Sequence, residues 1–235
     1  ILTGLTGVYG DRHGQPISNS YRYFKPDGTT GSAGSFAYWT APINSATNTT
    51  DSYGTMVNAQ GVTPPAPWVS YTRAGCNFGS VATANTILEN IGVDVPTVFG
   101  ANSPEATEVA SNPTKATADF VGIGIHCANG NAVCANGQTD KLPAEPGGYT
   151  GYQALFGHKY VAPQISPSGP LTDLNGNVIQ DKTGNAGFPG FDGMTPAVSL
   201  SYVAAMQEHG VPVTYAYLSD AHDDHTVGAA YGPGS

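Results

Sequence analysis

Apolar positions near the end of the chain predict a helix that is followed at once by a strand. Thr195 is typical of a helix cap and Pro196 of a first helical position, while Gly210 is typical of a helix end. Residues 211–218 then form a nearly continuous apolar, β-prone run, which is typical of a strand buried on both faces in a parallel sheet. The pattern predicts an α/β fold with a mostly parallel sheet and flanking helices.

Helical spacing and cap residues predict further helices earlier in the chain. In residues 77–90, apolar side chains recur every three or four positions. Residues 103–105, Ser-Pro-Glu, combine a cap, a proline suited to the first helical position and an acid in the first turn. The spacing also predicts a helix at about residues 115–125 and the end of a helix at residues 1–5.

Short aromatic runs and turn residues predict strands and hairpins in the remaining segments. Residues 20–24 and 35–39 are strand candidates, and residues 26–28, Pro-Asp-Gly, predict a turn. Residues 173–179 contain Asn-Gly and predict a hairpin. An EF-hand calcium loop is not favoured there, because Val178 stands at the sixth position, where such a loop has glycine.

The composition predicts long loops and argues against both a nucleic-acid partner and a membrane-spanning segment. The 235 residues include 31 Gly and 18 Pro, which predicts Gly/Pro-rich loop insertions, and the length favours a single domain over residues 1–235. A formal net charge of −9 argues against a nucleic-acid-binding surface. No stretch approaches the roughly 20 apolar residues that cross a bilayer, and no internal repeat is visible.

The three cysteines suggest the compartment. Cys127 and Cys134 bracket a polar, glycine-containing loop that one disulfide closes easily, which leaves Cys76 as the odd cysteine. Few lysines and a local disulfide favour a secreted or periplasmic protein. Reduced, buried thiols in a cytoplasmic protein are the alternative.

A cluster of ionisable residues directly follows the predicted C-terminal strand. It contains Asp220, His222 and His225, with Asp223 and Asp224 between the histidines. Ligands of open α/β sheets bind beyond the carboxyl ends of strands. A divalent cation would relieve the repulsion among these groups, and mixed nitrogen and oxygen donors suit zinc, manganese or iron better than calcium. A solvated acidic loop without a ligand explains the cluster equally well.

Two segments resemble the alkaline phosphatase superfamily, in particular its nucleotide pyrophosphatase/phosphodiesterase-like branch. Residues 5–14, Leu-Thr-Gly-Val-Tyr-Gly-Asp-Arg-His-Gly, resemble the stretch that follows the nucleophile of that family. Residues 217–225 and the Tyr-Gly-Pro at 231–233 resemble its metal-binding Asp and His and the sequence after them. The resemblance implies a hydrolase that attacks a small phosphate ester through a Ser or Thr nucleophile and two metal ions.

The same resemblance assigns the metal ligands and limits what this chain contains. Asp220 and His225, with His222 as the alternative histidine, would bind one ion, zinc first and calcium or manganese as alternatives. The nucleophile would precede Ile1 and a second set of ligands would follow Ser235, so the chain is expected to be an internal portion of a larger phosphoesterase domain. A noncatalytic extracellular binding or structural module on the same fold is the alternative function, and a calcium-stabilised extracellular domain is a third.

Overall fold

The chain forms two compact units. One contains residues 1–66 and 143–149, and the other contains residues 67–142 and 150–235. A computed structural model describes residues 20–24, 26–34, 68–81, 88–135 and 152–218 of these units. That the whole chain is one domain stays a prediction.

A β-hairpin is the described part of the first unit. Strand β1 (Ser20–Phe24) pairs antiparallel with β2 (Thr30–Gly34). Oδ1 of Asp27 stabilises the turn by accepting hydrogen bonds from N and Oγ1 of Thr29, at 2.9 and 2.7 Å. The predicted first strand and turn are confirmed, whereas the second predicted strand, residues 35–39, lies outside the described residues.

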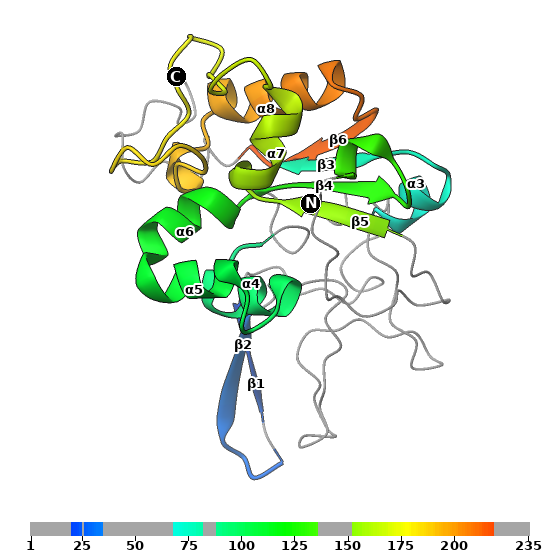
Figure 1. Ribbon diagram of the computed structural model, residues 1–235. Helices are drawn as coiled ribbons and strands as arrows, with labels where there is room; N and C mark the ends of the chain where they lie inside the picture. The colour runs from blue at the N-terminus through cyan, green and yellow to red at the C-terminus, as the bar shows by residue number, and fades with distance from the viewer. Residues whose placement is uncertain (1–19, 25, 35–67, 82–87, 136–151, 219–235) are drawn as a thin grey trace, which may run out of the picture. The chain divides into compact units, whose positions relative to one another are not determined.

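A four-stranded sheet forms the centre of the second unit, with the strand order β5-β4-β3-β6 (Figure 1). These strands are β3 (Phe78–Val81), β4 (Ile123–Ala128), β5 (Tyr152–Phe156) and β6 (Val213–Ala216). Strand β3 pairs in parallel with β6, whereas β4 pairs antiparallel with both β3 and β5. The α/β class with flanking helices is confirmed, but the prediction of a mostly parallel sheet is wrong for the described strands, since the sheet is mixed.

The path between β3 and β4 explains the mixed sheet. A parallel pair needs a crossover that carries the chain back to the other end of the sheet. Val81 at the end of β3 lies opposite Ile123 at the start of β4, so the helices between these strands return the chain to the end that it left. The αβ unit predicted from the C-terminal sequence therefore contains one strand of the parallel pair, and it does not determine the direction of β4 or β5.

Short helices surround this sheet. They are α3 (Val69–Arg73), α4 (Ile91–Phe99), α5 (Pro104–Ser111), α6 (Pro113–Phe120), α7 (His158–Ile165) and α8 (Pro196–Glu208), with 3-10 turns η1 (Ala132–Cys134) and η2 (Phe191–Gly193). Two helices begin at the predicted caps, because Ser103 Oγ accepts a hydrogen bond from Ala106 N and Thr195 Oγ1 accepts one from Val198 N. Among the described helices, none has the length and hydrophobicity to span a bilayer.

Two predicted helices are wrong where buried strands replace them. Within residues 77–90, Phe78–Val81 form β3, and every residue of this strand is buried. The helix predicted at 115–125 ends at Phe120, and β4 begins at Ile123. Burial on both faces of the sheet outweighs helical spacing in these apolar runs. The helix end predicted at residues 1–5 lies outside the described residues.

Helices α7 and α8 cover one face of the sheet (Figure 1). Gly79 in β3 permits this packing, because a Cβ atom there would lie 2.6 Å from Sδ of Met206 in α8. The core on this face, called the α7/α8 core below, is a cluster of buried apolar side chains that includes Val81, Ile125 and Leu155 from the strands. Alternation along β3 and β4 places Phe78 and His126 on the opposite face.

The opposite face of the sheet has an aromatic core. The rings of Trp68 and His126 are both buried and stack with their centroids 3.8 Å apart. Phe156 meets His126 edge to face at 5.5 Å, and Phe99 of α4 meets Phe156 at 6.2 Å. These contacts join α3 and α4 to the middle of the sheet.

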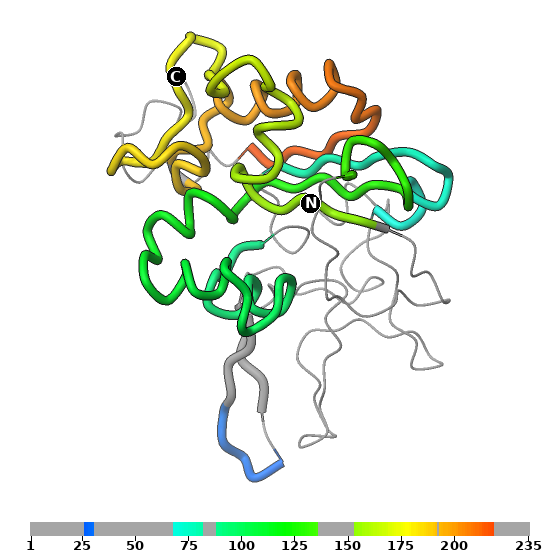
Figure 2. Tube along the Cα trace, in the orientation of Figure 1, coloured from blue at the N-terminus to red at the C-terminus, as the bar shows by residue number. Residues whose placement is uncertain are grey.

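Two successive loops of the same pattern connect α7 to α8 (Figure 2, yellow). Residues 173–177 and 181–185 share the sequence Asp-x-x-Gly-Asn, and in each loop the aspartate Oδ1 accepts backbone hydrogen bonds from residues two and four positions ahead. Bridges between Thr172 and Val178 and between Gln180 and Ala186 close the loops. The hairpin predicted at 173–179 is confirmed, and the short repeat corrects the expectation that the chain has none.

Candidate functional site

The two parallel strands of the sheet lead to the predicted metal ligands. Residues Phe78 to Val81 of β3 lie beside Val213 to Ala216 of β6 in matching order, so both strands end at the same edge. Tyr217 N donates a hydrogen bond to Val81 O at 3.1 Å and extends the pairing by one residue. Tyr217 therefore lies at the carboxyl edge that β3 and β6 share, and residues 219–225 follow it closely in the sequence.

The predicted ligands themselves, Asp220, His222 and His225, lie outside the described residues. Asp223 and Asp224 also lie there. Their donor types, carboxylate oxygen and imidazole nitrogen, fit a zinc ion. Among the residues that the structure describes, no three His, Cys, Asp or Glu side chains come together in a way that could hold a metal.

The described residues next to this edge are weakly polar. Ser80, one residue before the end of β3, lies opposite Tyr215 of β6. Its buried hydroxyl has no hydrogen-bond partner among the described residues. Burial and, to a smaller extent, the electrostatic effect of the neighbouring Tyr217 raise the pKa of Tyr215. A neutral hydroxyl and protonated phenols are poor zinc ligands, so the fit to a metal depends on the segment after β6.

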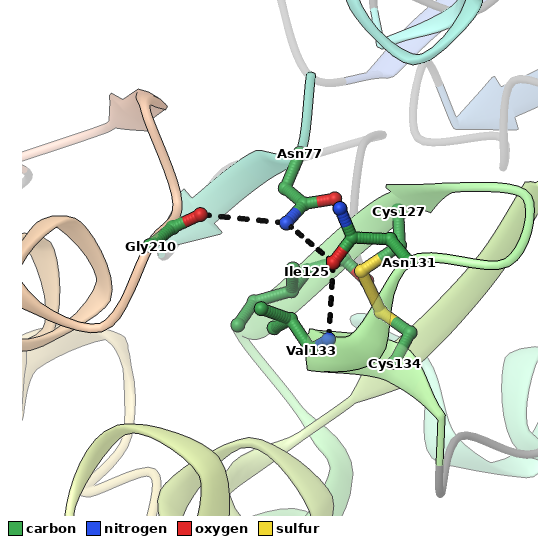
Figure 3. The surroundings of a disulfide bond; sticks show 7 residues. All are labelled: Asn77, Ile125, Cys127, Asn131, Val133, Cys134 and Gly210. Carbon is green, nitrogen blue, oxygen red and sulfur yellow. Dashed lines mark hydrogen bonds between the residues drawn. A yellow bond between two sulfur atoms is a disulfide. The ribbon is translucent and has the colours of Figure 1, made fainter. Parts of the chain in front are cut away.

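The predicted disulfide is present and lies near the ends at which β3 and β6 begin (Figure 3). Cys127 at the end of β4 and Cys134 in η1 are buried and joined by an S–S bond of 2.02 Å. Asn131, inside the closed loop, accepts a hydrogen bond from Val133 N at 3.0 Å and another from Nδ2 of Asn77 at 3.1 Å.

The side chain of Asn77 joins this loop to two other elements. Asn77 immediately precedes β3, and its Nδ2 also donates to the carbonyl oxygen of Gly210 at 3.4 Å. Gly210 lies between α8 and β6. The disulfide loop therefore stabilises the starts of both parallel strands, at the edge opposite to their carboxyl ends.

The His126-Cys127 pair does not form a metal or thiol site in the described structure. Adjacent residues of a strand point to opposite faces of the sheet. Cys127 belongs to the α7/α8 core and is in the disulfide, whereas His126 stacks on Trp68. Both residues therefore have structural roles.

His158, which is partly buried, forms a polar pair with the buried Tyr202 that the sequence alone does not indicate. It is the first residue of α7, and its Nδ1 lies 2.5 Å from the hydroxyl oxygen of Tyr202 in α8. Burial lowers the pKa of His158 from 6.5 to about 4 and raises the pKa of Tyr202. The two residues are 44 positions apart, so no local motif could have indicated the pair.

A cluster of ion pairs joins α5, α6 and α7. Lys115 pairs with Glu108 at 2.8 Å and also with Asp119, while Lys159 pairs with Glu108 at 2.7 Å. Burial alone would raise the pKa of Glu108, but hydrogen bonds from the two lysines outweigh it and lower the pKa to about 2. Because acids and bases in this cluster neutralise one another, it has the character of a structural network.

Comparisons of this chain with protein-family models, with curated proteins and with solved structures find no match. The resemblance to the alkaline phosphatase superfamily therefore stays a prediction. The function must be argued from the residues and geometry of the chain itself.

Proposed function

We propose that this chain is part of an exported, metal-dependent phosphoric-ester hydrolase of the alkaline phosphatase type. The observation that supports the proposal is the parallel pairing of β3 and β6, because both strands end at one carboxyl edge and residues 219–225 follow β6 closely in the sequence. This is the edge at which open α/β sheets bind their ligands. The resemblance of residues 5–14 and 217–225 to the superfamily supports the same activity.

In this proposal, Asp220 and one of the two histidines, His225 or His222, bind the metal. The carboxylate offers negative charge, and the neutral imidazole offers a nitrogen that is available above its pKa. A bound zinc ion would stabilise the negative charge that develops on the phosphate oxygens. The hydrogen bond from Tyr217 to β3 supports this assignment, because it holds the chain at the sheet edge two residues before residue 219.

Export is the second part of the proposal. The disulfide between Cys127 and Cys134 supports an oxidising compartment, because disulfides persist in secreted and periplasmic proteins and are rare in the cytosol. The substrate class is a small phosphate ester, and the net charge of −9 disfavours extended nucleic acid as a partner.

The test compares variants of one segment in the complete source protein. Asp220→Asn, His222→Ala and His225→Ala are assayed for bound metal by elemental analysis and for phosphatase and phosphodiesterase activity before and after chelation. Asp223→Asn and Asp224→Asn serve as matched controls, since they remove one charge each from the same segment. We expect Asp220→Asn and one histidine variant to lose metal and activity, and the controls to keep both.

Three results would contradict the proposal or part of it. Activity that resists chelation would exclude a metal-dependent hydrolase. Full activity in Asp220→Asn and in both histidine variants would exclude the ligand assignment. Loss of bound calcium in all three aspartate variants, with no phosphoesterase activity in the parent, would favour a calcium-stabilised binding domain.

A further inference from the structure

The contact between α7 and α8 contains one hydrogen-bonded pair of titratable side chains in a largely apolar surrounding. The Tyr202 ring is fully buried in the α7/α8 core, and the His158 ring meets it edge to face at 5.9 Å. Nδ1 of His158 and the Tyr202 hydroxyl are within hydrogen-bond distance, at 2.5 Å. The pair therefore joins the first turn of α7 to the middle of α8.

The neutral forms of both side chains match each other. A phenol has one proton to donate, and a neutral imidazole with its proton on Nε2 has one lone pair to accept it at Nδ1. Among the described residues, His158 is the hydrogen-bond partner of the Tyr202 hydroxyl. Protonation of His158 would turn Nδ1 into a donor to the Tyr202 oxygen, and the Tyr202 proton, displaced from Nδ1, would need another acceptor in a buried site.

We propose that the hydrogen bond between His158 and Tyr202 is an acid-sensitive latch, which holds α7 to α8 at neutral pH and opens when the imidazole gains a second proton. The latch acts on the strand that leads to residues 219–225, because α8 continues into β6 through a tight turn in which Val211 N donates to Met206 O. Opening it would loosen the helix that packs over β3 and β6.

Charges on the neighbouring elements do not replace the missing acceptor. Helix α7 packs against α6, α8, β4 and β5, and the segment that ends at Gly187 approaches His158. Strands β4 and β5 contain no charged residue; their titratable residues are His126, on the opposite face of the sheet, and Tyr152. The charged residues of the other elements and of α7 are Lys115, Asp119, Lys159, Asp181, Lys182 and Glu208. Asp119 forms ion pairs with Lys115 and Lys159. Asp181 accepts hydrogen bonds within its own loop, for example from Asn185 N, and Glu208 is the last residue of α8. Burial accordingly determines the low pKa of His158.

The direction of the pH effect follows from the two pKa values. The pKa of His158 is about 4 in the folded chain, below the ordinary value of 6.5 that applies to the unfolded chain. Unfolding therefore takes up a proton in the window between them, and the stability due to neutral His158 is complete above pH 6.5 and is lost as the pH falls toward 4.

The first test is urea unfolding of the full chain near pH 7 and near pH 4.5, for the parent, for His158→Gln and for His209→Gln. Glutamine accepts a hydrogen bond but does not titrate, and His209 is an exposed histidine at the end of α8. Acidification should raise the unfolding equilibrium constant of the parent about 50-fold more than that of His158→Gln. His209→Gln should not show this loss of acid response.

The second test separates opening of the latch from global unfolding. Hydrogen exchange, corrected for its intrinsic pH dependence, should accelerate in α7 and in α8 near Tyr202 on acidification, while β4 stays protected. An equal acid response in the parent and His158→Gln, or equal acceleration in α7, α8 and β4, would overturn the proposal. If His158→Gln does not fold, His158→Asn takes its place, because asparagine also accepts a hydrogen bond and does not titrate. An acid response of His158→Asn equal to that of the parent would overturn the proposal.

Discussion

Removal of the disulfide between Cys127 and Cys134 should destabilise the second unit by an amount that its short loop determines. The perturbation is the double variant Cys127→Ala/Cys134→Ala, in which alanine avoids placing a hydroxyl in the buried site. The bridged residues are seven positions apart. The chain-entropy model for a loop of this length gives about 2.5 kcal/mol at 25 °C.

The hydrogen bonds of Asn131 add to this value, because the bridge holds the loop that presents Asn131 to Asn77. If both bonds of Asn77 Nδ2 weaken in the variant, the loss grows by about 1 kcal/mol. The expected total of about 3.5 kcal/mol corresponds to a melting temperature lower by roughly 7 to 14 °C for a chain of this size.

The assay is thermal and urea unfolding followed by circular dichroism, with Cys76→Ala as the matched control. Cys76 is the free cysteine of the described residues and lies next to Asn77, so its removal tests the loss of a sulfur without the loss of a crosslink. The parent, but not the double variant, should also lose stability when reductant is present during unfolding. Equal melting temperatures for the parent and the double variant would refute the reasoning.

Two further predictions concern Glu89 and Gly157. Burial and, to a smaller extent, the charge of Asp94 raise the pKa of Glu89 from 4.5 to about 7. The fold therefore favours the protonated carboxyl, and the parent loses stability as the pH rises from about 4.5 to 7. Glu89→Gln should remove this pH dependence and raise the free energy of unfolding by about 1 kcal/mol at pH 8 in urea titrations; the gain is limited because solvent reaches the carboxyl. If the variant keeps the pH profile of the parent, Glu89 is not the cause of the loss. Gly157→Ala should cost about 3 kcal/mol or more, because its Cβ would lie 2.1 Å from the carbonyl oxygen of Asp119 and φ is 78°. Gly130→Ala, with the same φ of 78° and no atom within 4 Å, should cost only about 1 kcal/mol in the same unfolding assay, and equal losses would show that the close approach at Gly157 is unimportant.

Local sequence signals predicted the elements that local interactions define. The caps at Ser103 and Thr195, the turn at Asp27 and the disulfide loop all depend on residues within eight positions of one another. These features could be read from the sequence because their energy comes from neighbours along the chain.

Strands β3, β4 and β5 could not be assigned in this way. The run that contains Val81 has helical spacing, and only burial between two layers makes it a strand. The direction of β4 depends on where α4, α5 and α6 return the chain, which no local pattern encodes. The same limit applies to His158, because its partner Tyr202 is distant in sequence. The predicted ligands Asp220, His222 and His225 lie outside the described residues, so their assignment stays a prediction.

The order of the strands also has a consequence for how the chain folds as it is made. Strand β3 obtains its antiparallel partner β4 about 45 positions later, but Phe78 must wait for Val213 to complete the parallel pair. The disulfide loop can close as soon as Cys134 has entered an oxidising compartment, whereas the bond from Asn77 to Gly210 spans 133 positions. During synthesis, the edge of β3 that pairs with β6 therefore lacks this partner until β6 has been made, and such an edge favours aggregation of an unfinished chain.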